Sequence, residues 1–236
     1  MRVACVVFAC ALVPTFPACN PSPASADAAP PATIASAESA PVRHYRTALG
    51  ITPLAINEIC PGPARDWDGS GAFSSRDDEW VELVNTGGAA LPLAGFFVSD
   101  NDSTPRLALG GTLDTGARLL VFGRESYDWE RANGYPAFGL SLGNSGDAVL
   151  LWQAVGADTV LVDTYAYRSH EAAADRAIGR APDGSGAWML FDSLNPYTGT
   201  LTPSGTGCAP TPGALNVCGS TGARGSTWGR VKSLYR

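Results

Sequence analysis

The sequence is poor in charged side chains and in histidine. Only 16% of its 236 residues are charged, and 22 acidic residues outnumber 16 basic ones, which gives a formal net charge of −6. This balance argues against general nucleic-acid binding, because phosphate backbones are bound by clustered Lys and Arg. The chain has two histidines, no HExxH pattern, no Gly-rich phosphate loop ending in Lys and no paired-cysteine zinc spacing. The usual sequence patterns of zinc and nucleotide sites are therefore missing.

The composition is instead that of an all-β fold. Hydrophobic residues make up 45% of the chain, enough for a core, while 27 Gly and 18 Pro supply turns. Extended, β-rich segments bounded by turn residues predict strands at 54–59, 80–85, 96–98, 117–122, 148–153, 159–167, 177–180 and 188–191. The two segments around 154–158 form a hairpin, and short helical turns are expected only at 127–133 and 171–176. Periodicity alone thus indicates a β-sandwich or barrel.

Residues 1–19 have the pattern of an export signal. Arg2 supplies a basic start, and the apolar run from Val3 to Val13 is too short to span a bilayer as a helix. The following Phe16-Pro17-Ala18-Cys19 resembles the lipobox of bacterial lipoproteins, in which the cysteine is diacylated. We expect an exported protein, either secreted or anchored at the cell envelope through a lipid on Cys19.

Residues 20–53 are rich in Ala, Pro and Ser and contain few large apolar side chains. Such a segment cannot bury enough surface to offset the entropy of ordering its backbone, so it is predicted to be a disordered tether.

Five short motifs distinguish the middle of the chain. They are Ile56-Asn57-Glu58, Glu79-Trp80-Val81-Glu82-Leu83-Val84-Asn85, Leu91-Pro92-Leu93-Ala94-Gly95-Phe96, Leu142-Gly143-Asn144-Ser145-Gly146-Asp147 and Thr211-Pro212-Gly213-Ala214-Leu215-Asn216. In that order, over residues 54–216, they resemble a lamin tail domain, a module that is also carried by secreted bacterial proteins. The resemblance implies an immunoglobulin-like β-sandwich with no reaction attached, and we place this domain at residues 54–218.

Three cysteines remain once Cys5, Cys10 and Cys19 are assigned to the leader. Cys208 and Cys218 flank the Pro-rich segment that ends the domain, and in an oxidising compartment the favoured pairing is a disulfide between these two. Cys60 is then unpaired, although a bridge from Cys60 to either of the others stays open.

The loop that begins at Asp66 matches the spacing of an EF-hand calcium loop. Asp66, Asp68 and Ser70 fall at positions one, three and five, Gly71 at position six, and Asp77 at position twelve. Calcium prefers several oxygen ligands, which these four polar side chains supply. The alternative is a plain acidic loop, because no helices flank the segment and Asp and Gly are common in solvated turns.

Signals for an enzyme are weaker. Gly139-Leu140-Ser141-Leu142-Gly143 matches the expression for a nucleophile elbow, but a turn and a strand follow it where an elbow requires a helix. The histidines are His44, in the tether, and His170, which we expect at the surface. A metal-dependent hydrolase would draw its ligands from Asp66, Asp68, Asp77, Glu79 and Glu82.

Six tryptophans raise the alternative of carbohydrate binding, since sugars stack on aromatic faces. Trp80, Trp152 and Trp188 lie within predicted strands and are expected in or near the core, which leaves Trp67 and Trp129 as the better exposed candidates.

The final segment, residues 219–236, carries four basic residues and no acid: Arg224, Arg230, Lys232 and Arg236. Its alternating end indicates a docking or cell-surface sorting tail, able to add as a strand or to bind an anionic surface. The alternatives are a short terminal strand packed on the acidic face of the domain, or a disordered end.

The function predicted from the sequence is a non-catalytic exported module that binds a protein or a cell-surface polymer through its loops. The alternative is a calcium-dependent carbohydrate-binding module, and a metal-dependent hydrolase ranks third.

Overall fold

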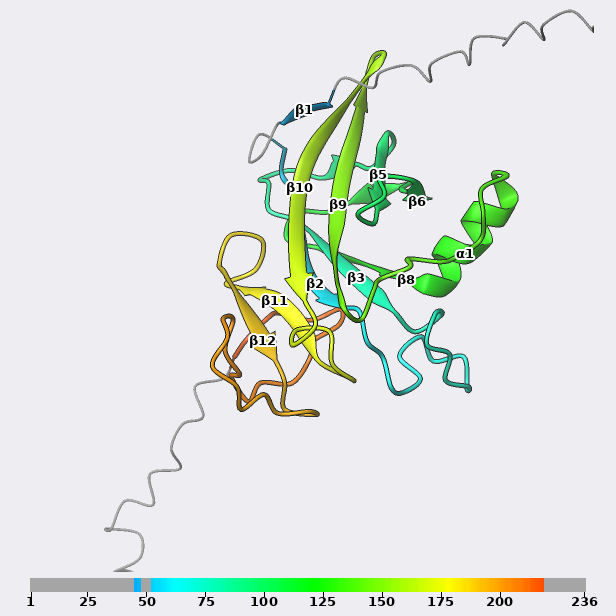
Figure 1. The fold of residues 1–236 in the computed structure, drawn as a ribbon. Coiled ribbons are helices and arrows are strands. Elements are labelled where there is room, and N and C mark those ends of the chain that lie inside the picture. Colours follow the sequence, from blue (N-terminus) through cyan, green and yellow to red (C-terminus); the bar gives the residue numbers. More distant parts are fainter. Residues whose placement is uncertain (1–44, 48–51, 219–236) are drawn as a thin grey trace, which may run out of the picture. The chain divides into compact units, whose positions relative to one another are not determined.

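Two five-stranded sheets form the domain in the computed structural model, which describes residues 45–47 and 52–218 (Figure 1). Predictions for the export signal, Cys19, most of the tether and the basic tail lie outside these residues. Sheet I has the strand order β1-β10-β9-β5-β6, and sheet II has the order β12-β11-β2-β3-β8. The pair β4-β7 forms a small third sheet.

The elements follow one another in this order: β1 (Tyr45–Thr47), β2 (Leu54–Cys60), β3 (Trp80–Asn85), β4 (Leu91–Pro92), β5 (Phe96–Ser99), β6 (Pro105–Ala108), β7 (Thr112–Leu113), β8 (Arg118–Phe122), α1 (Gly123–Ala132), β9 (Gly146–Val155), β10 (Asp158–Arg168), β11 (Ala177–Ala181) and β12 (Ala187–Phe191). All strand pairs are antiparallel except β1 with β10. The predicted strands are thus confirmed, each to within two residues at either end.

Side chains point to alternate faces along each strand, and those that face the other sheet form the core between the two sheets. Val81 and Leu83 of β3 point inward from sheet II, while Val149 and Leu151 of β9 point inward from sheet I, and all four are fully buried. The alternate residues of β3 point outward and build a second, smaller cluster on the outer face of sheet II, around Trp80, Cys60, Ala177 and Phe191. This outer cluster matters for the site and for the C-terminal end of the domain.

The expected hairpin is the pair β9–β10, which runs in front of β2 and β3 in Figure 1 and turns at Gly156 with φ +64°. The expected helical turns were only partly right. Residues 127–132 belong to a longer helix, α1, which begins directly after β8, and Asn133 is its C-cap. Residues 171–176 form turns rather than a helix, and Asp175 there has φ +52°, which a helix does not allow.

Cys208 and Cys218 are joined by a disulfide with a Cα–Cα distance of 5.4 Å, as favoured from the sequence. Cys60 is a free, buried thiol in the outer cluster of sheet II. No helix among the residues that the structure describes is long and apolar enough to span a membrane.

Candidate functional site

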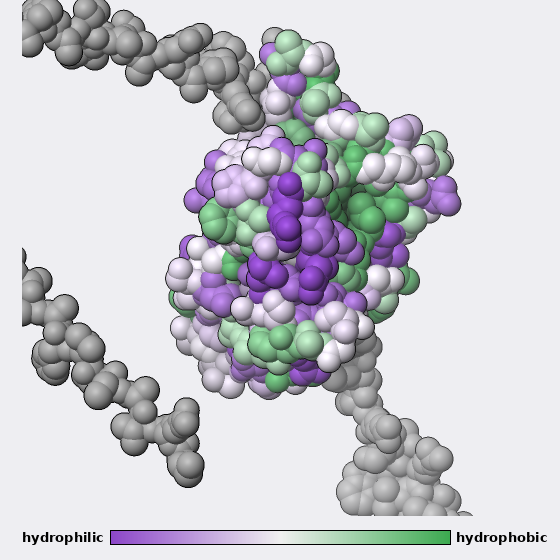
Figure 2. Space-filling view, turned by 90° about the vertical axis from the view of Figure 1, so that its right-hand side faces the viewer, coloured by the Kyte–Doolittle hydropathy of each residue, from purple (hydrophilic) through white to green (hydrophobic). Residues whose placement is uncertain are grey.

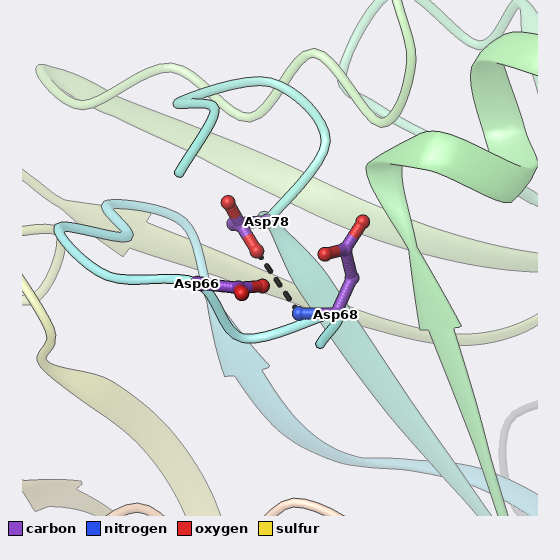
Figure 3. Close-up of side chains that lie close together, drawn as sticks. All are labelled: Asp66, Asp68 and Asp78. Carbon is purple, nitrogen blue, oxygen red and sulfur yellow. Dashed lines mark hydrogen bonds between the residues drawn. The ribbon is translucent and has the colours of Figure 1, made fainter. Parts of the chain in front are cut away.

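The long loop between β2 and β3 gathers three aspartates at one end of sheet II. Oxygens of Asp66, Asp68 and Asp78 all lie within 4.8 Å of one another (Figure 3). Asp66 is exposed, Asp68 is half-buried and Asp78 is buried, so the group spans from the surface into the base of the loop. Such a group of hard oxygen ligands is the kind of arrangement that binds Ca²⁺.

Asp78 holds the loop in its conformation. Its Oδ1 accepts the backbone N–H of Trp67 at 2.6 Å and that of Asp68 at 2.9 Å, the latter drawn in Figure 3. Its Oδ2 accepts the N–H of Ser74 at 2.7 Å. A single buried carboxylate therefore anchors three backbone groups of the loop.

The exposed part of the loop is closed by the other two aspartates. Asp66 accepts the N–H groups of Ser70 and Gly71, at 3.1 and 2.8 Å, and Asp68 accepts the N–H of Ser70 at 2.8 Å. Gly71 has φ +91°, a conformation that side-chain-bearing residues rarely adopt, which explains the glycine at this position. Each carboxylate has about four lone-pair positions, so these bonds leave acceptor capacity for a cation.

The base of the loop is fixed from another part of the chain. Asp175, in the turn before β11, accepts the N–H of Ala64 and the indole N–H of Trp67, both at 2.9 Å. The Trp67 ring meets the Trp80 ring edge-on, with centroids 6.0 Å apart. Trp67 is consequently a structural part of the loop as well as a half-exposed aromatic surface.

Asp77 and Ser70, the other two predicted calcium ligands, are differently engaged. The Asp77 carboxylate pairs with Arg76 at 2.6 Å and with Arg124 at 2.9 Å, and it is not part of the aspartate group. Its hydrogen bond with Arg76 is the largest effect on its pKa, which is lowered. The Ser70 hydroxyl donates to the carbonyl of Ala72 at 3.1 Å. The structure thus brings two of the four predicted residues together and adds Asp78.

The pKa of Asp68 is also below its ordinary value. Desolvation is the largest single effect and raises the pKa, but the hydrogen bonds from Ser70 and Asp66 together outweigh it. The lowered pKa favours an ionised carboxylate at neutral pH, which is the form that a cation requires.

The remaining acids of the hydrolase hypothesis do not converge on this loop. Glu79 is buried and accepts the N–H of Leu142 at 3.1 Å. Glu82 is also buried, and accepts from the Asn57 amide at 2.7 Å and the Gly213 N–H at 2.6 Å. Both carboxylates are therefore committed to holding other segments of the chain.

The proposed nucleophile and histidine are not paired either. Ser141 has φ +58°, a strained conformation for a non-glycine residue, but β9 follows where a nucleophile elbow has a helix. The His170 ring packs 4.9 Å from the Tyr197 ring, and neither of its nitrogens has a hydrogen-bond partner. Ser141 therefore has no histidine base among the described contacts.

The tryptophans are placed largely as the strand pattern predicted. Trp80 is fully buried and Trp152 is 3% exposed. Trp188 is half-buried. Its ring centroid lies 3.9 Å from that of Tyr165 and 4.6 Å from the guanidinium carbon of Arg180.

The surface near α1 is mixed in character. Figure 2 looks onto this side, where a strongly hydrophilic band borders hydrophobic residues. Trp129 of α1 stacks on Tyr135 at 5.3 Å, and Phe138 in the following loop is 58% exposed. Exposed aromatic rings of this kind are common in binding surfaces.

Two stacked antiparallel sheets, with ordered loops at their ends, define an immunoglobulin-like β-sandwich. The lamin tail domain family model matches residues 50–169, and the chain belongs to this family. Searches of curated proteins and of solved structures found no significant match. An immunoglobulin-like domain of this kind is compatible with a non-catalytic binding module, and many such modules mediate protein interactions.

Proposed function

We propose that this chain is an exported, non-catalytic binding module whose loops engage a protein or polymer partner. One observation carries the proposal: the buried carboxylates serve to order loops. Asp78 and Asp175 fix the β2–β3 loop, and Asp192 accepts three N–H groups of the loop after β12, at 2.7–3.0 Å. Glu130 of α1 accepts the N–H groups of Phe138 and Gly139 at 2.6 and 2.8 Å.

Ordered loops suit recognition because less conformational entropy is lost when a partner binds. Of the acids that a hydrolase would need, Glu79 and Glu82 accept hydrogen bonds from other segments, and Asp77 pairs with two arginines. The combination favours a rigid display of surface residues over catalysis.

Binding is tested by co-sedimentation of the purified chain with isolated bacterial cell-wall polymer, and by biosensor measurements against cell-surface proteins. Asp175→Ala releases the base of the β2–β3 loop and is expected to weaken binding at least about threefold if this loop contacts the partner. Asp128→Ala, on the exposed side of α1, is the matched control. Turnover of an ester or phosphodiester substrate that Asp66→Ala/Asp68→Ala abolishes would contradict the non-catalytic assignment.

Export is supported by the leader of residues 1–19 and by the disulfide between Cys208 and Cys218, since such bonds persist in oxidising compartments. Mass spectrometry of the membrane and medium fractions tests it. We expect a mature amino terminus at or near Cys19, with a diacylglycerol on its sulfur in the anchored form. Cys19→Ser should move the protein from membrane to medium, and an uncleaved chain in the cytoplasm would contradict export.

A second candidate function, calcium-dependent carbohydrate binding, is favoured by the group of Asp66, Asp68 and Asp78. Trp67 lies in the same loop, where its ring could support a sugar. Calorimetric titration with Ca²⁺ is expected to give heat in the unaltered protein and none in Asp66→Ala/Asp68→Ala, with Asp128→Ala unchanged. Absence of heat in the unaltered protein removes this candidate.

A further inference from the structure

Strand β8 is an edge of sheet II, because it pairs with β3 alone among the described strands. Figure 1 places it beyond β3 on the side where α1 begins. The other edge of this sheet, β12, is accompanied by the loop after it, through the bridge between Leu190 and Gly205. An open edge offers backbone groups to an additional strand.

The hydrogen bonds at both ends of β8 define which backbone groups are free. Gly123 donates its N–H to Glu79 at 2.8 Å, and Asn85 donates to Ala117 at 3.1 Å. Because hydrogen-bonded and non-hydrogen-bonded pairs alternate in an antiparallel ladder, Leu119 and Val121 also bond to β3. The N–H groups of Arg118 and Leu120 therefore point away from β3.

The capping bond of α1 agrees with this alternation. Phe122 is two residues beyond Leu120, and its N–H points to the same open side, where the Glu125 side chain accepts it at 2.6 Å. Arg118 and Leu120 have no such acceptor in the described part of the chain, so their N–H groups are available to a further strand.

The C-terminal segment starts on the same face of the sheet. Leu120 and Phe122 pack against the outer cluster of sheet II, and Cys208 packs against that cluster as well. Cys208 is bonded to Cys218, after which the described chain ends. Nine residues separate Cys218 from Trp228, and an extended chain of that length spans about 30 Å. The end of the chain can therefore reach β8.

The folded domain and the C-terminal segment carry net charges of opposite sign. Residues 52–218 carry twenty acidic side chains and nine arginines, whereas residues 219–236 carry four basic residues and no acid. At one end of β8, the Arg118 guanidinium is paired with Asp183. Its Nε also lies 3.7 Å from a carboxylate oxygen of Glu82. At the other end, Arg124 is close enough to Asp68 to contribute to its lowered pKa. The acids near β8 are thus already paired with Arg118 and Arg124 at its two ends, and the complementarity lies in the net negative charge of the domain.

We propose that residues 228–236 add to β8 as a sixth strand of sheet II. Their sequence, Trp-Gly-Arg-Val-Lys-Ser-Leu-Tyr-Arg, alternates so that Arg230 and Lys232 share one face of the strand and Val231 lies on the other. Main-chain bonds to Arg118 and Leu120 supply the attachment, and the net negative charge of the domain favours a basic segment. The added strand covers an edge that would otherwise be open to aggregation.

Hydrogen exchange of individual amides, measured by NMR on the natural processed chain, tests the proposal. The Leu120 amide is expected to be protected in the unaltered protein and to exchange at least about tenfold faster in Val231→Pro, because proline cannot continue the ladder. Thr221→Pro, in the segment before the strand, is the matched control and should change nothing. Leu119 and Val121, bonded to β3, are internal controls in every variant.

Reversal of charge by Arg230→Glu/Lys232→Glu is expected to have the same effect as Val231→Pro. Both sets of changes leave residues 52–218 unaltered, so the two sheets should stay folded and the effect should be confined to the edge at β8. Equal exchange of Leu120 in the unaltered and Val231→Pro proteins overturns the proposal. Protection that falls on dilution, together with a dimer in light scattering, also overturns it, since a second copy would then occupy the edge.

Discussion

Three glutamates are buried in or beside sheet II: Glu58 in β2, Glu82 in β3 and Glu79 just before β3. Burial is the largest cause of the raised pKa in all three, and the pKa reaches about 8 for Glu58 and about 8 for Glu79. Protonated carboxyl groups are therefore favoured in the folded state over part of the physiological range.

The raised pKa values predict that stability falls as pH rises. Between pH 4.5 and about 8 the folded state retains a proton on Glu79 that the unfolded chain has released, so the free energy of unfolding decreases across this window. Glu79→Gln keeps an acceptor for Leu142 and removes the titration. We expect the decrease between pH 5 and pH 8, measured by urea unfolding, to be smaller in this variant by roughly 1–4 kcal/mol.

Asp114→Asn, at an exposed position, is the control for the loss of one negative charge and should leave the pH dependence as it is. A Glu79→Gln profile that is parallel to that of the unaltered protein would show that Glu79 does not titrate in this window.

The acids of the β2–β3 loop show how far a local motif predicts a site. Spacing alone identified Asp66 and Asp68, which do lie together, but it assigned the third carboxylate to Asp77. Asp77 and Asp78 lie in the turn before β3, whose backbone conformation decides which of the two faces the loop. Asp78 turns toward the loop, whereas Asp77 turns toward Arg76 and Arg124.

At the scale of elements, the segment Thr211–Asn216 is bound to the outer face of sheet II as a ligand would be. Thr211 donates its hydroxyl to Glu58 at 2.7 Å, and Gly213 donates its N–H to Glu82 at 2.6 Å. Asn216 donates its amide to the carbonyl of Asn57 at 3.2 Å. The segment thereby supplies hydrogen-bond partners to Glu58 and adds one to Glu82, which also accepts from Asn57.

Gly179 of β11 allows this segment to lie close to the sheet. A Cβ at this position would be 2.6 Å from the Asn216 amide nitrogen and 2.8 Å from the Phe191 ring. Gly179→Ala is expected to displace the segment, lower the free energy of unfolding by about 1–3 kcal/mol and increase cleavage near residue 214 in limited proteolysis.

Gly88→Ala is the matched control, because a Cβ at Gly88 has open space around it and its φ is not positive. The free energy of unfolding of this variant should be within about 0.5 kcal/mol of that of the unaltered protein. Equal proteolysis of the two variants would show that the segment does not depend on Gly179.

Helix α1 was only partly predicted, and its contacts explain why. Its N-cap residue is Phe122, which provides no side-chain cap, so the usual start signal is missing. Its position depends on the buried ion pair of Glu130 with Arg106 of β6, at 3.0 Å. This partner is 24 residues away in the sequence and cannot be inferred from a local pattern.

At the scale of the whole molecule, the folded domain extends well beyond the family match at residues 50–169. Strand β11 completes sheet II by pairing with β2, and β12 pairs with β11. The disulfide between Cys208 and Cys218 then closes the segment that binds Glu58 and Glu82. The last 49 residues up to Cys218 are thus part of the same folded unit.

Loss of the disulfide is expected to destabilise the domain by roughly 2–4 kcal/mol, because an unconstrained unfolded chain has more entropy. Thermal unfolding of Cys208→Ser/Cys218→Ser, compared with the oxidised protein, measures the change. Reductant should lower the midpoint of the unaltered protein and leave that of the double variant where it is. An unaltered midpoint in both would contradict a stabilising role for this bond.

The sequence by itself determined the class of fold, the strands and the faces that they bury, because side-chain alternation in a strand is a local property with a period of two residues. It also identified the disulfide, whose cysteines are ten residues apart. Only the tertiary structure decided which carboxylates meet and which are enclosed. Glu58 and Thr211 lie 153 residues apart, and Trp67 and Asp175 lie 108 apart. Contacts over such distances depend on how the sheets stack, and no local pattern specifies them.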